Sequence, residues 1–380
     1  MQSVQKEMDS KGEIGVIALS SFEEMGQKID HHIKAGRKGE GIVPLETYII
    51  PIEEIRFSSG EAKSRLPHSV RGRDIFLLCD PGNYSCTYQM RGVINHKSPD
   101  DHFQDLKRAI SAVCGKALSL TVVMPQFYSS RQDRRKGRES LDCATALQEL
   151  ENMGVNRILS FDLHDSRVQN AVPLVSFDNL YATYQILTQF LKDERDSALD
   201  KENLVIISPD AGGVDRALYY STILGANVSF FYKRRDADAI VNGKNPIVAH
   251  QFVGQSVEGK TVIIVDDLIA TGGSILDILN ELKNQGAKKI FIATTFAQFT
   301  EGIDKFQECY EQGKLDRIYS TNLTYLGEDV KNAEWFKEVD MSEAIAKFID
   351  RLYHNKSIKP YIDATKTLTE HVKELRNTKN

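Results

Sequence analysis

Short apolar runs alternate with amphipathic segments along most of this chain. Residues 21–34 and 214–224 have the spacing of apolar positions expected of helices that cover a sheet. The apolar runs are rich in β-branched residues and contain few polar positions, which is typical of parallel strands buried on both faces. The predicted strands are residues 15–19, 74–79, 120–124, 157–161, 204–207, 228–232, 261–265 and 289–296. Strands and helices in alternation predict an α/β fold.

Length and composition narrow this picture. The 380 residues suggest about two domains, and a new series of strands and helices begins after residues 171–177. Hydrophobic residues make up 41% and charged residues 27%, as in soluble globular proteins. The net charge of −5 argues against a chain that binds nucleic acid as a whole, although a local basic patch is still possible.

The cysteines and the termini indicate the compartment. Five cysteines without a CxxC spacing fit neither a zinc site nor a disulfide framework, and they favour a reducing cytosol. The first residues lack the apolar core of a signal peptide, and no apolar run approaches the roughly 20 residues that span a bilayer. We therefore expect a soluble cytoplasmic protein without a membrane partner.

Polar side chains that carry chemistry follow the predicted strands. Ligands of parallel sheets bind beyond the carboxyl ends of the strands. Five side chains lie just past an apolar run, namely Arg131, His164, Asp210, Lys233 and Asp266. The sequence therefore predicts a site at these strand ends.

The most informative motif is Val-Asp-Asp-Leu-Ile-Ala-Thr-Gly-Gly-Ser, residues 265–274. A glycine turn that leads into a helix presents backbone N–H groups to an anion such as phosphate. The two carboxylates before the turn would repel a phosphate, so they suit sugar hydroxyls or a bound Mg²⁺. Together these features predict a site for a phosphorylated pentose. The alternative is an ordinary strand-to-helix turn with an aspartate N-cap.

Two further acidic motifs follow strands. Asp162, His164 and Asp165 form a cluster that suits Mg²⁺ or a phosphate chain, or else they are hydrogen-bonded loop residues. Residues 208–213, Ser-Pro-Asp-Ala-Gly-Gly, repeat the order of strand, acid, glycine and helix. Asp210 is there either a ligand or a helix N-cap.

Two basic segments and one aromatic turn complete the candidates. Residues 131–138 and 233–235 suit a polyphosphate, and the second segment leads into a long loop that could shield phosphoryl transfer from water. Solvated loops or a nucleic-acid patch are the alternatives. Residues 57–61 combine an aromatic ring, hydroxyls and a carboxylate, which suits base stacking or a plain hairpin turn.

In this order the motifs resemble those of ribose-phosphate pyrophosphokinases, or phosphoribosyl pyrophosphate synthetases. The family has Phe-Ser-Asp-Gly-Glu, Arg-Gln-Asp, Asp-Leu-His-Ala, Ser-Pro-Asp-Ala-Gly-Gly, Lys-Arg-Arg and Val-Asp-Asp with a Thr-Gly-Gly-Thr type of turn. The matching segments here are 57–61, 131–134, 162–165, 208–213, 233–235 and 265–274, and the resemblance covers about residues 15–339.

The resemblance implies two similar phosphoribosyltransferase-like domains, each a mainly parallel sheet flanked by helices. The expected divisions are an N-terminal extension (1–13), an N-terminal domain (14–172), a C-terminal domain with the pentose-phosphate loop (173–325) and a C-terminal helical segment (326–380). The implied reaction transfers the diphosphoryl group of Mg²⁺-ATP, the co-substrate, to ribose 5-phosphate, and releases AMP.

The resemblance also implies roles for individual residues. Asp266 and Asp267 would take the ribose hydroxyls, while the 5-phosphate would bind at Ala270, Thr271, Gly272, Gly273 and Ser274. Mg²⁺-ATP would be held by His164 and Asp210, with Asp162 and Asp178 as neighbours. Lys233 and Arg235 would be the catalytic loop cations.

Nucleotide binding is implied for a second set of residues. Arg131, Gln132 and Asp133 match nucleotide-binding positions. Phe57, Ser59 and Glu61 match an adenine pocket that is completed across a subunit interface, which implies a homo-oligomer, a hexamer or a dimer.

The chain departs from the family pattern at several points. Ser59 replaces an aspartate, Asp165 replaces an alanine, and an insertion separates Tyr84 from the helix that contains Asp105. Three other functions compete with the synthetase. A type I phosphoribosyltransferase would lack the His164 motif and the basic loop, a non-catalytic synthetase-associated subunit would have gaps in its loops, and an RNA-binding module would use residues 131–138.

Overall fold

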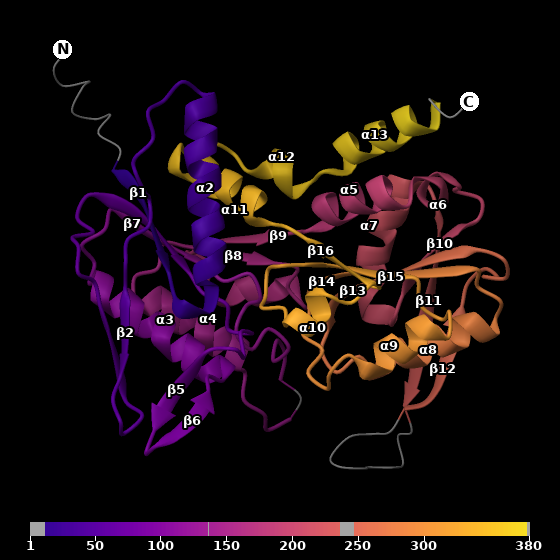
Figure 1. Ribbon diagram of the computed structural model, residues 1–380, viewed down its shortest axis with the longest axis horizontal. Coiled ribbons are helices and arrows are strands. Elements are labelled where there is room, and N and C mark those ends of the chain that lie inside the picture. The colour runs from indigo at the N-terminus through magenta and orange to yellow at the C-terminus, as the bar shows by residue number, and fades with distance from the viewer. Residues whose placement is uncertain (1–11, 136, 236–246, 378–380) are drawn as a thin grey trace. The chain divides into compact units, whose positions relative to one another are not determined.

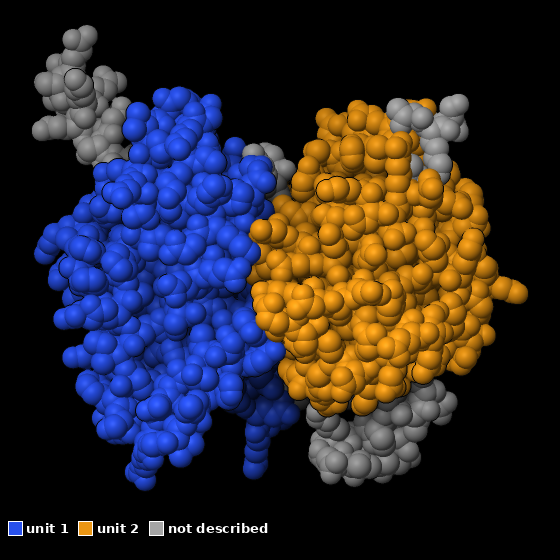
Figure 2. Space-filling model, in the orientation of Figure 1, with its two compact units in different colours: residues 1–180, 323–325, 341–358 blue, residues 181–322, 326–340, 359–380 orange. Residues whose placement is uncertain are grey.

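The computed structural model describes residues 12–135, 137–235 and 247–377. These form two compact units (Figure 2). Unit 1 contains the chain up to Leu180 together with Leu323–Tyr325 and Met341–Ile358, and unit 2 contains Tyr181–Asn322, Leu326–Asp340 and Lys359–Asn380. The expected C-terminal segment 326–380 is therefore shared between the units, and it includes a strand, β16 (Phe336–Val339), as well as helices.

Unit 1 is built around a five-stranded parallel sheet. Its strand order is β1 (Glu13–Ala18), β4 (Arg73–Leu78), β7 (Ser119–Val123), β8 (Arg157–Phe161) and β9 (Ser176–Leu180). Helices α3 (Pro99–Val113) and α4 (Asp142–Asn152) lie on one face, and α2 (Glu23–Gly39) and α11 (Ser342–Tyr353) lie on the other (Figure 1). The short 3₁₀ helices η1 (Ser20–Phe22) and η2 (Ser166–Ala171) lie in loops.

Alternation along the strands explains why both faces are covered. Leu77 and Val122 belong to the cluster that includes α3 and α4, whereas Phe161 meets Phe348 of α11 with ring centroids 6.2 Å apart. Successive strand residues point to opposite faces, so an uninterrupted apolar run needs helices on both. Helix α3 begins at a capping box, in which Ser98 and Asp101 exchange hydrogen bonds.

Two small antiparallel hairpins extend from unit 1. The first joins β2 (Glu53–Arg56) to β3 (Ala62–Arg65), and the second joins β5 (Thr87–Met90) to β6 (Val93–His96). Their strands are four residues long and none of their residues is buried, so they lack the apolar signal that marks the sheet strands. The second hairpin occupies the insertion after Tyr84.

Unit 2 is built around a seven-stranded sheet. Its order is β12 (Ile247–Val253), β11 (Asn227–Arg235), β10 (Leu204–Ser208), β13 (Thr261–Ile269), β14 (Lys289–Ala297), β15 (Arg317–Thr321) and β16. All neighbours are parallel except β11 and β12. One face carries α8 (Gly273–Asn284), α9 (Asp304–Glu311) and α10 (Glu328–Lys331). The other carries α5 (Thr183–Asp193) and α7 (Val214–Leu224) (Figure 1).

The remaining helices of unit 2 are peripheral. They are α6 (Arg195–Leu199), α12 (Lys359–Ile362) and α13 (Thr365–Asn377), together with the 3₁₀ helix η3 (Ala211–Gly213). Helix α13 packs on α7, where Arg376 donates a 2.6 Å hydrogen bond to the carbonyl of Leu224. No helix in the described ranges is long and apolar enough to cross a bilayer.

The predicted α/β fold with sheets flanked by helices is confirmed, and all eight predicted strands are present. Several ends differ. Strand β13 continues to Ile269 instead of ending at Val265, because β14 runs alongside it as far as the pairs Leu268–Phe296 and Ile269–Ala297. Strand β11 likewise continues to Arg235 because it pairs with β12.

The buried carboxylate of Asp80 connects the segment after β4 to residues 323–325, which belong to the same unit. Asp80 is fully buried at the end of β4 and accepts hydrogen bonds from the hydroxyl of Thr324 at 3.1 Å and the N–H of Tyr325 at 2.8 Å. The N–H of Gly82 donates a third at 2.8 Å. Burial raises the pKa of Asp80 to about 7, although these hydrogen bonds lower it.

This shift predicts a pH dependence of stability. The folded-state pKa lies above the ordinary value of 3.8, so the native state keeps a proton that the unfolded chain releases as pH rises. The contribution of Asp80 is fully present below about pH 4 and is lost as pH rises through about 7. We expect the unfolding midpoint of the parent to fall between pH 5 and pH 8 relative to that of Asp80→Asn, measured by calorimetry. A constant difference between the two proteins would contradict the assignment.

Candidate active site

The sheet of unit 2 changes direction between β10 and β13. After β10 the chain passes through α7 to β11 on one side, whereas β13 leads through α8 to β14 on the other. The β10–β13 ladder ends at the pair Ile207–Ile264. Beyond it, among the described residues, Val265, Asp266, Leu268 and Ile269 of β13 pair with β14 alone. Such a switch point leaves a crevice at the carboxyl ends of the strands, where open α/β sheets bind ligands.

Asp266 and Asp267 lie on this part of β13, beyond its ladder with β10. The N–H of Asp267 donates to Oδ1 of Asp266 at 3.0 Å. Burial and the neighbouring charge of Asp267 raise the pKa of Asp266, whereas Arg216 lowers it. Arg216 belongs to α7, and its Nη2 lies 4.0 Å from Oδ2 of Asp267. A cation from α7 therefore partly offsets the two adjacent carboxylates.

The glycine turn that follows has the geometry of an anion site. Gly272 adopts φ +81°, and a Cβ built on it would lie 2.5 Å from ring atoms of Phe306. Only glycine meets both conditions without strain. Thr271 and Gly273 are exposed at the start of α8, and the first turn of that helix contains no acidic residue. The backbone N–H groups and the helix dipole thus favour an anion there.

The rest of the predicted phosphate loop is tied to the sheet end. The carbonyl of Ala270 accepts from the N–H of Thr300 at 2.9 Å, and the carbonyl of Ile269 accepts from Gln298 at 2.8 Å. Ser274 is half-buried in the first turn of α8. The structure therefore brings residues 266–274 together at one strand end of unit 2.

Asp210 lies on the other side of the switch point. Its Oδ1 accepts from the N–H groups of Gly212 and Gly213 at 2.8 and 3.1 Å, so it caps η3 as the alternative interpretation predicted. Residues of η3 contact β13, so the 210–213 turn lies against the strand that carries the acidic pair. Both of the capping hydrogen bonds use the same carboxylate oxygen, Oδ1.

The predicted catalytic cations cannot be placed by their side chains. The backbones of Lys233 and Arg235 form the end of β11, in register with His250 and Ile247 of β12. Their side chains, and residues 236–246 of the predicted loop, lie outside the described residues.

In unit 1 the turn after β8 exposes His164. Asp162 precedes it with φ +45°, and its N–H donates to the carbonyl of Leu180 at 2.8 Å. The N–H of Leu163 donates to Oδ1 of Asn179 at 3.1 Å. Asn179 holds this turn and was not foreseen, because it lies in β9, which was not among the predicted strands.

Asp178 occupies a different position from its expected neighbours. It lies inside β9 opposite Leu159, where burial raises its pKa and Arg157 lowers it. Among the described residues, no three His, Cys, Asp or Glu side chains gather so that they could hold a metal ion. The structure therefore does not make Asp162, His164 and Asp178 a metal centre by themselves.

The charge of Asp165 is compensated within the same turn. Both of its oxygens accept hydrogen bonds from the guanidinium of Arg167. This pairing is the main reason why the pKa of Asp165 falls to about 2. The extra negative charge that distinguishes this motif from the family pattern is therefore paired with a cation.

The basic loop before α4 divides into outward and inward residues. Arg131 and Gln132 are exposed, as nucleotide-binding residues would be. The side chain of Asp133 is only 2% exposed, and its Oδ2 has no hydrogen-bond partner within the described residues. Burial and then Asp133 raise the pKa of Cys143 in α4 to about 12. Asp133 thus points toward α4 and away from the loop surface.

Phe57, Ser59 and Glu61 share the turn between β2 and β3. Phe57 is 45% exposed, and the hydroxyl of Ser59 donates to Oε2 of Glu61 at 3.1 Å. Gly60 adopts φ +96° and closes the turn through a 2.9 Å hydrogen bond to the carbonyl of Phe57. An exposed ring beside a hydroxyl–carboxylate pair offers a planar base both a stacking surface and polar partners.

The fold and the 265–274 turn define a phosphoribosyltransferase type of domain in unit 2. A family model described as "Phosphoribosyl transferase domain" matches residues 176–318. The model for the "N-terminal domain of ribose phosphate pyrophosphokinase" matches residues 14–154.

Relatives extend this likeness over most of the chain. The ribose-phosphate pyrophosphokinase of Staphylococcus aureus is 30% identical over 311 residues, covering 81% of this chain and 88% of that protein. The enzyme of the same name from Prochlorococcus marinus is 30% identical over 316 residues, covering 81% and 85%. The chain belongs to the ribose-phosphate pyrophosphokinase family, as its motifs predicted.

A solved structure confirms the fold. Phosphoribosylpyrophosphate synthetase from Mycobacterium smegmatis superposes with a TM-score of 0.73 at 24% identity, covering 90% of this chain and 99% of that one.

Proposed function

We propose that this protein transfers the diphosphoryl group of Mg²⁺-ATP to the 1-hydroxyl of ribose 5-phosphate, giving 5-phosphoribosyl 1-diphosphate and AMP. The observation that supports the proposal is the turn at Gly272, whose geometry at the start of α8 suits an anion and which follows Asp266 and Asp267 in the same strand-to-helix connection. Phosphate and vicinal hydroxyls lie at opposite ends of a phosphorylated pentose, and residues 266–274 offer partners for both.

The nucleotide would bind through residues of unit 1. Phe57, Ser59 and Glu61 would receive the adenine, and Arg131 and Gln132 would contact the phosphates. Asp133 belongs to the same motif, but its burial supports a role in shaping the loop. Because the family motif has an aspartate where this chain has Ser59, a neutral hydroxyl would face the adenine amine.

The donors that are present suit a Mg²⁺ ion that is held mainly by the substrate. In phosphoryl-transfer sites Mg²⁺ takes one or two protein ligands and completes its shell with water and phosphate oxygens. His164 and Asp210 would supply these ligands, with Asp162 nearby, and the placement of Asp178 inside β9 supports its role least. When bound, the ion neutralises phosphate charge.

Catalysis would require positioning and charge neutralisation without a covalent enzyme intermediate. The ribose 1-hydroxyl attacks the β-phosphorus, the bond between the α- and β-phosphoryl groups breaks at the bridging oxygen, and AMP leaves. Lys233 and Arg235 would stabilise the negative charge on the transferred group. Asp266 and Asp267 would orient the pentose by accepting hydrogen bonds from its hydroxyls.

Two of the competing functions, the type I phosphoribosyltransferase and the non-catalytic subunit, are supported less well. A type I phosphoribosyltransferase has no use for the N-terminal unit, whose match to the synthetase N-terminal domain covers residues 14–154. A non-catalytic subunit has no use for an intact 265–274 turn. Self-association as a hexamer or a dimer and a cytoplasmic location are part of the same proposal.

An assay of AMP release tests the function. The protein is incubated with ATP, Mg²⁺ and ribose 5-phosphate, with and without inorganic phosphate, and AMP and the diphosphate ester are separated by chromatography. Equimolar formation of the two products is the expected result. In a second incubation with 5-phosphoribosyl 1-diphosphate and a free base, formation of a nucleoside monophosphate and diphosphate, with no AMP released in the first, would favour the transferase. No turnover in either incubation would favour the non-catalytic subunit. Light scattering of the same sample gives the oligomeric state.

A further inference from the structure

The inserted segment after Tyr84 packs against the turn proposed to receive the nucleotide base. Its hairpin, β5–β6, lies beside the β2–β3 hairpin in unit 1. The N–H of Arg91 at its tip donates to the carbonyl of Ser58 at 3.1 Å. A Cβ on Gly60 would lie 2.6 Å from Sδ of Met90, so the two turns are in close contact. The insertion thus reaches the backbone of residues 57–61 at two points.

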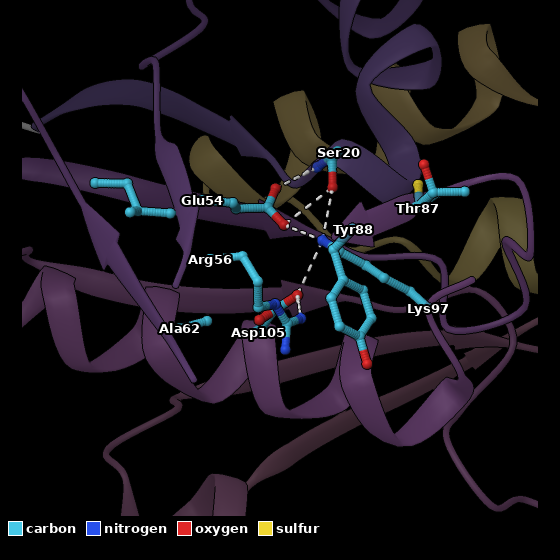
Figure 3. Close-up of a pocket in the computed structure, with 10 residues that line it drawn as sticks. Ser20, Glu54, Arg56, Ala62, Thr87, Tyr88, Lys97 and Asp105 are labelled. Atoms are coloured by element: carbon cyan, nitrogen blue, oxygen red, sulfur yellow. Dashed lines mark hydrogen bonds and ion pairs between the residues drawn. The ribbon is translucent and has the colours of Figure 1, made fainter. Parts of the chain in front are cut away.

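Arg56 contacts both the insertion and the turn of residues 57–61. Its guanidinium carbon lies 4.2 Å from the centroid of the Tyr88 ring, which is a cation–π distance. Nη1 donates to the carbonyl of Gly60 at 3.0 Å, and Nη2 donates to Asp105 of α3 at 3.3 Å. Figure 3 shows the Tyr88 ring beside the Arg56 guanidinium and the Asp105 carboxylate. One side chain therefore joins the turn, the insertion and the helix.

Lys97 fixes the other end of the insertion. Its side chain is 8% exposed, and Nζ lies 2.9 Å from Glu54 of β2 and 2.9 Å from Asp105. It also donates to the hydroxyl of Ser20 at 3.2 Å (Figure 3). The three ammonium protons thus have three acceptors. Arg108 occupies the remaining oxygen of Asp105.

A cavity of about 250 Å³ lies between the two hairpins and α3. Its charged wall residues, Glu54, Arg56, Lys97 and Asp105, are paired with one another. A buried charge that already has a partner of opposite sign gains little from a charged ligand. If the ligand displaced that partner, the partner's own charge would be left buried and unpaired. The arrangement therefore suits a brace between the hairpins better than a ligand site.

We propose that hairpin β5–β6 is a positioning element for base recognition: through Tyr88, Arg56 and the Arg91–Ser58 contact it holds residues 57–61 in the conformation that receives the nucleotide. This inference rests on the proposed function of that turn. A turn held in its bound conformation has less freedom to lose when it binds. Loosening it should weaken ATP binding and leave the diphosphoryl transfer itself unchanged.

The test is a comparison of Tyr88→Leu with Tyr88→Phe. Leucine removes the ring that stacks on Arg56, whereas phenylalanine keeps it. We expect Tyr88→Leu to raise KM for ATP about three- to tenfold. KM for ribose 5-phosphate and kcat should remain those of the parent, and Tyr88→Phe should match the parent throughout. Tyr184→Leu, a half-exposed tyrosine of α5 in unit 2, is the matched control.

A double-mutant cycle examines the link through Arg56. Lysine cannot contact the Gly60 carbonyl and Asp105 at once as the forked guanidinium does. Tyr88→Leu should therefore raise KM for ATP less in an Arg56→Lys background than in the parent. Equal KM for ATP in Tyr88→Leu and Tyr88→Phe would overturn the proposal. An equal rise for both substrates with a lowered unfolding midpoint would show a role in folding alone and would overturn it as well.

Amide exchange separates this inference from the proposed function. If the parent releases no AMP, the function fails, but hydrogen exchange at residues 57–61 still decides the positioning role. Faster exchange there in Tyr88→Leu than in Tyr88→Phe supports a turn held by the insertion. Equal exchange in the two variants refutes it, whatever the activity of the parent.

Discussion

A Lys233→Ala variant should lose at least about a hundredfold in kcat, while KM for ribose 5-phosphate stays close to that of the parent. The transferred diphosphoryl group carries spread negative charge in the transition state, and one lost charge-stabilising contact costs about a hundred- to a thousandfold. The measurement is AMP release at saturating concentrations of both substrates. Arg235→Ala should show a loss of the same kind.

Lys288→Ala supplies the control for the Lys233 experiment. Lys288 is an exposed lysine of the same unit, just before β14, so its removal changes the net charge equally. A kcat within about twofold of the parent is expected for it. A Lys233→Ala enzyme with parental kcat would remove Lys233 from the chemistry and leave the 265–274 turn as the only supported part of the site.

Gly272→Ala should raise KM for ribose 5-phosphate by at least about tenfold and lower the unfolding midpoint. An alanine at φ +81° costs about 1–2 kcal/mol, and its Cβ would in addition lie 2.5 Å from the Phe306 ring. Phe306 is 1% exposed and stacks on Trp335, so it has little room to move. The turn must shift instead, and a misplacement of about 1 Å can cost a hundredfold in rate.

Gly302→Ala isolates the steric part of this effect. Gly302 also has φ +81°, but a Cβ there would meet no atom within 4 Å. Both variants should lose stability from the backbone conformation, and only Gly272→Ala should lose affinity for ribose 5-phosphate. Parental KM for ribose 5-phosphate in Gly272→Ala would refute a phosphate site at this turn.

The apolar pattern predicted eight of the twelve strands in the two sheets, because most of these strands are buried on both faces, but it missed β9, β12, β15 and β16. Strands such as β8 and β13 contain four or five consecutive buried residues, so their signal is strong. The hairpins β2–β3 and β5–β6 contain no fully buried residue and carry no such signal. The signal of β9 is also weak, because only Leu180 of this strand is buried.

The candidate site was easiest to predict where it depends on backbone conformation. Gly272 stands out because few residues other than glycine tolerate the backbone conformation of this turn. The acidic pair before it stands out because two adjacent carboxylates rarely follow an apolar strand without a partner of opposite charge or a ligand. Side-chain direction was not predictable. Asp133 follows two exposed residues and yet turns inward, and Asn179, which was not predicted, accepts a hydrogen bond from the N–H of Leu163 in the turn before His164. These outcomes depend on packing between strands, which a single sequence does not contain.

Unit 1 includes a segment from late in the chain, residues 341–358, so a single cut cannot separate the two units. A fragment that stops at Leu180 would lack α11, whose Asp350 lies 2.8 Å from Arg37 of α2 and whose Phe348 meets Phe161. The face of the sheet that α11 shares with α2 would be partly uncovered, and the guanidinium of Arg37 would lose its partners Asp350 and His354. Gene truncation at the apparent midpoint should thus yield insoluble halves, whereas co-expression of the first 180 residues with the remainder could restore the missing helix.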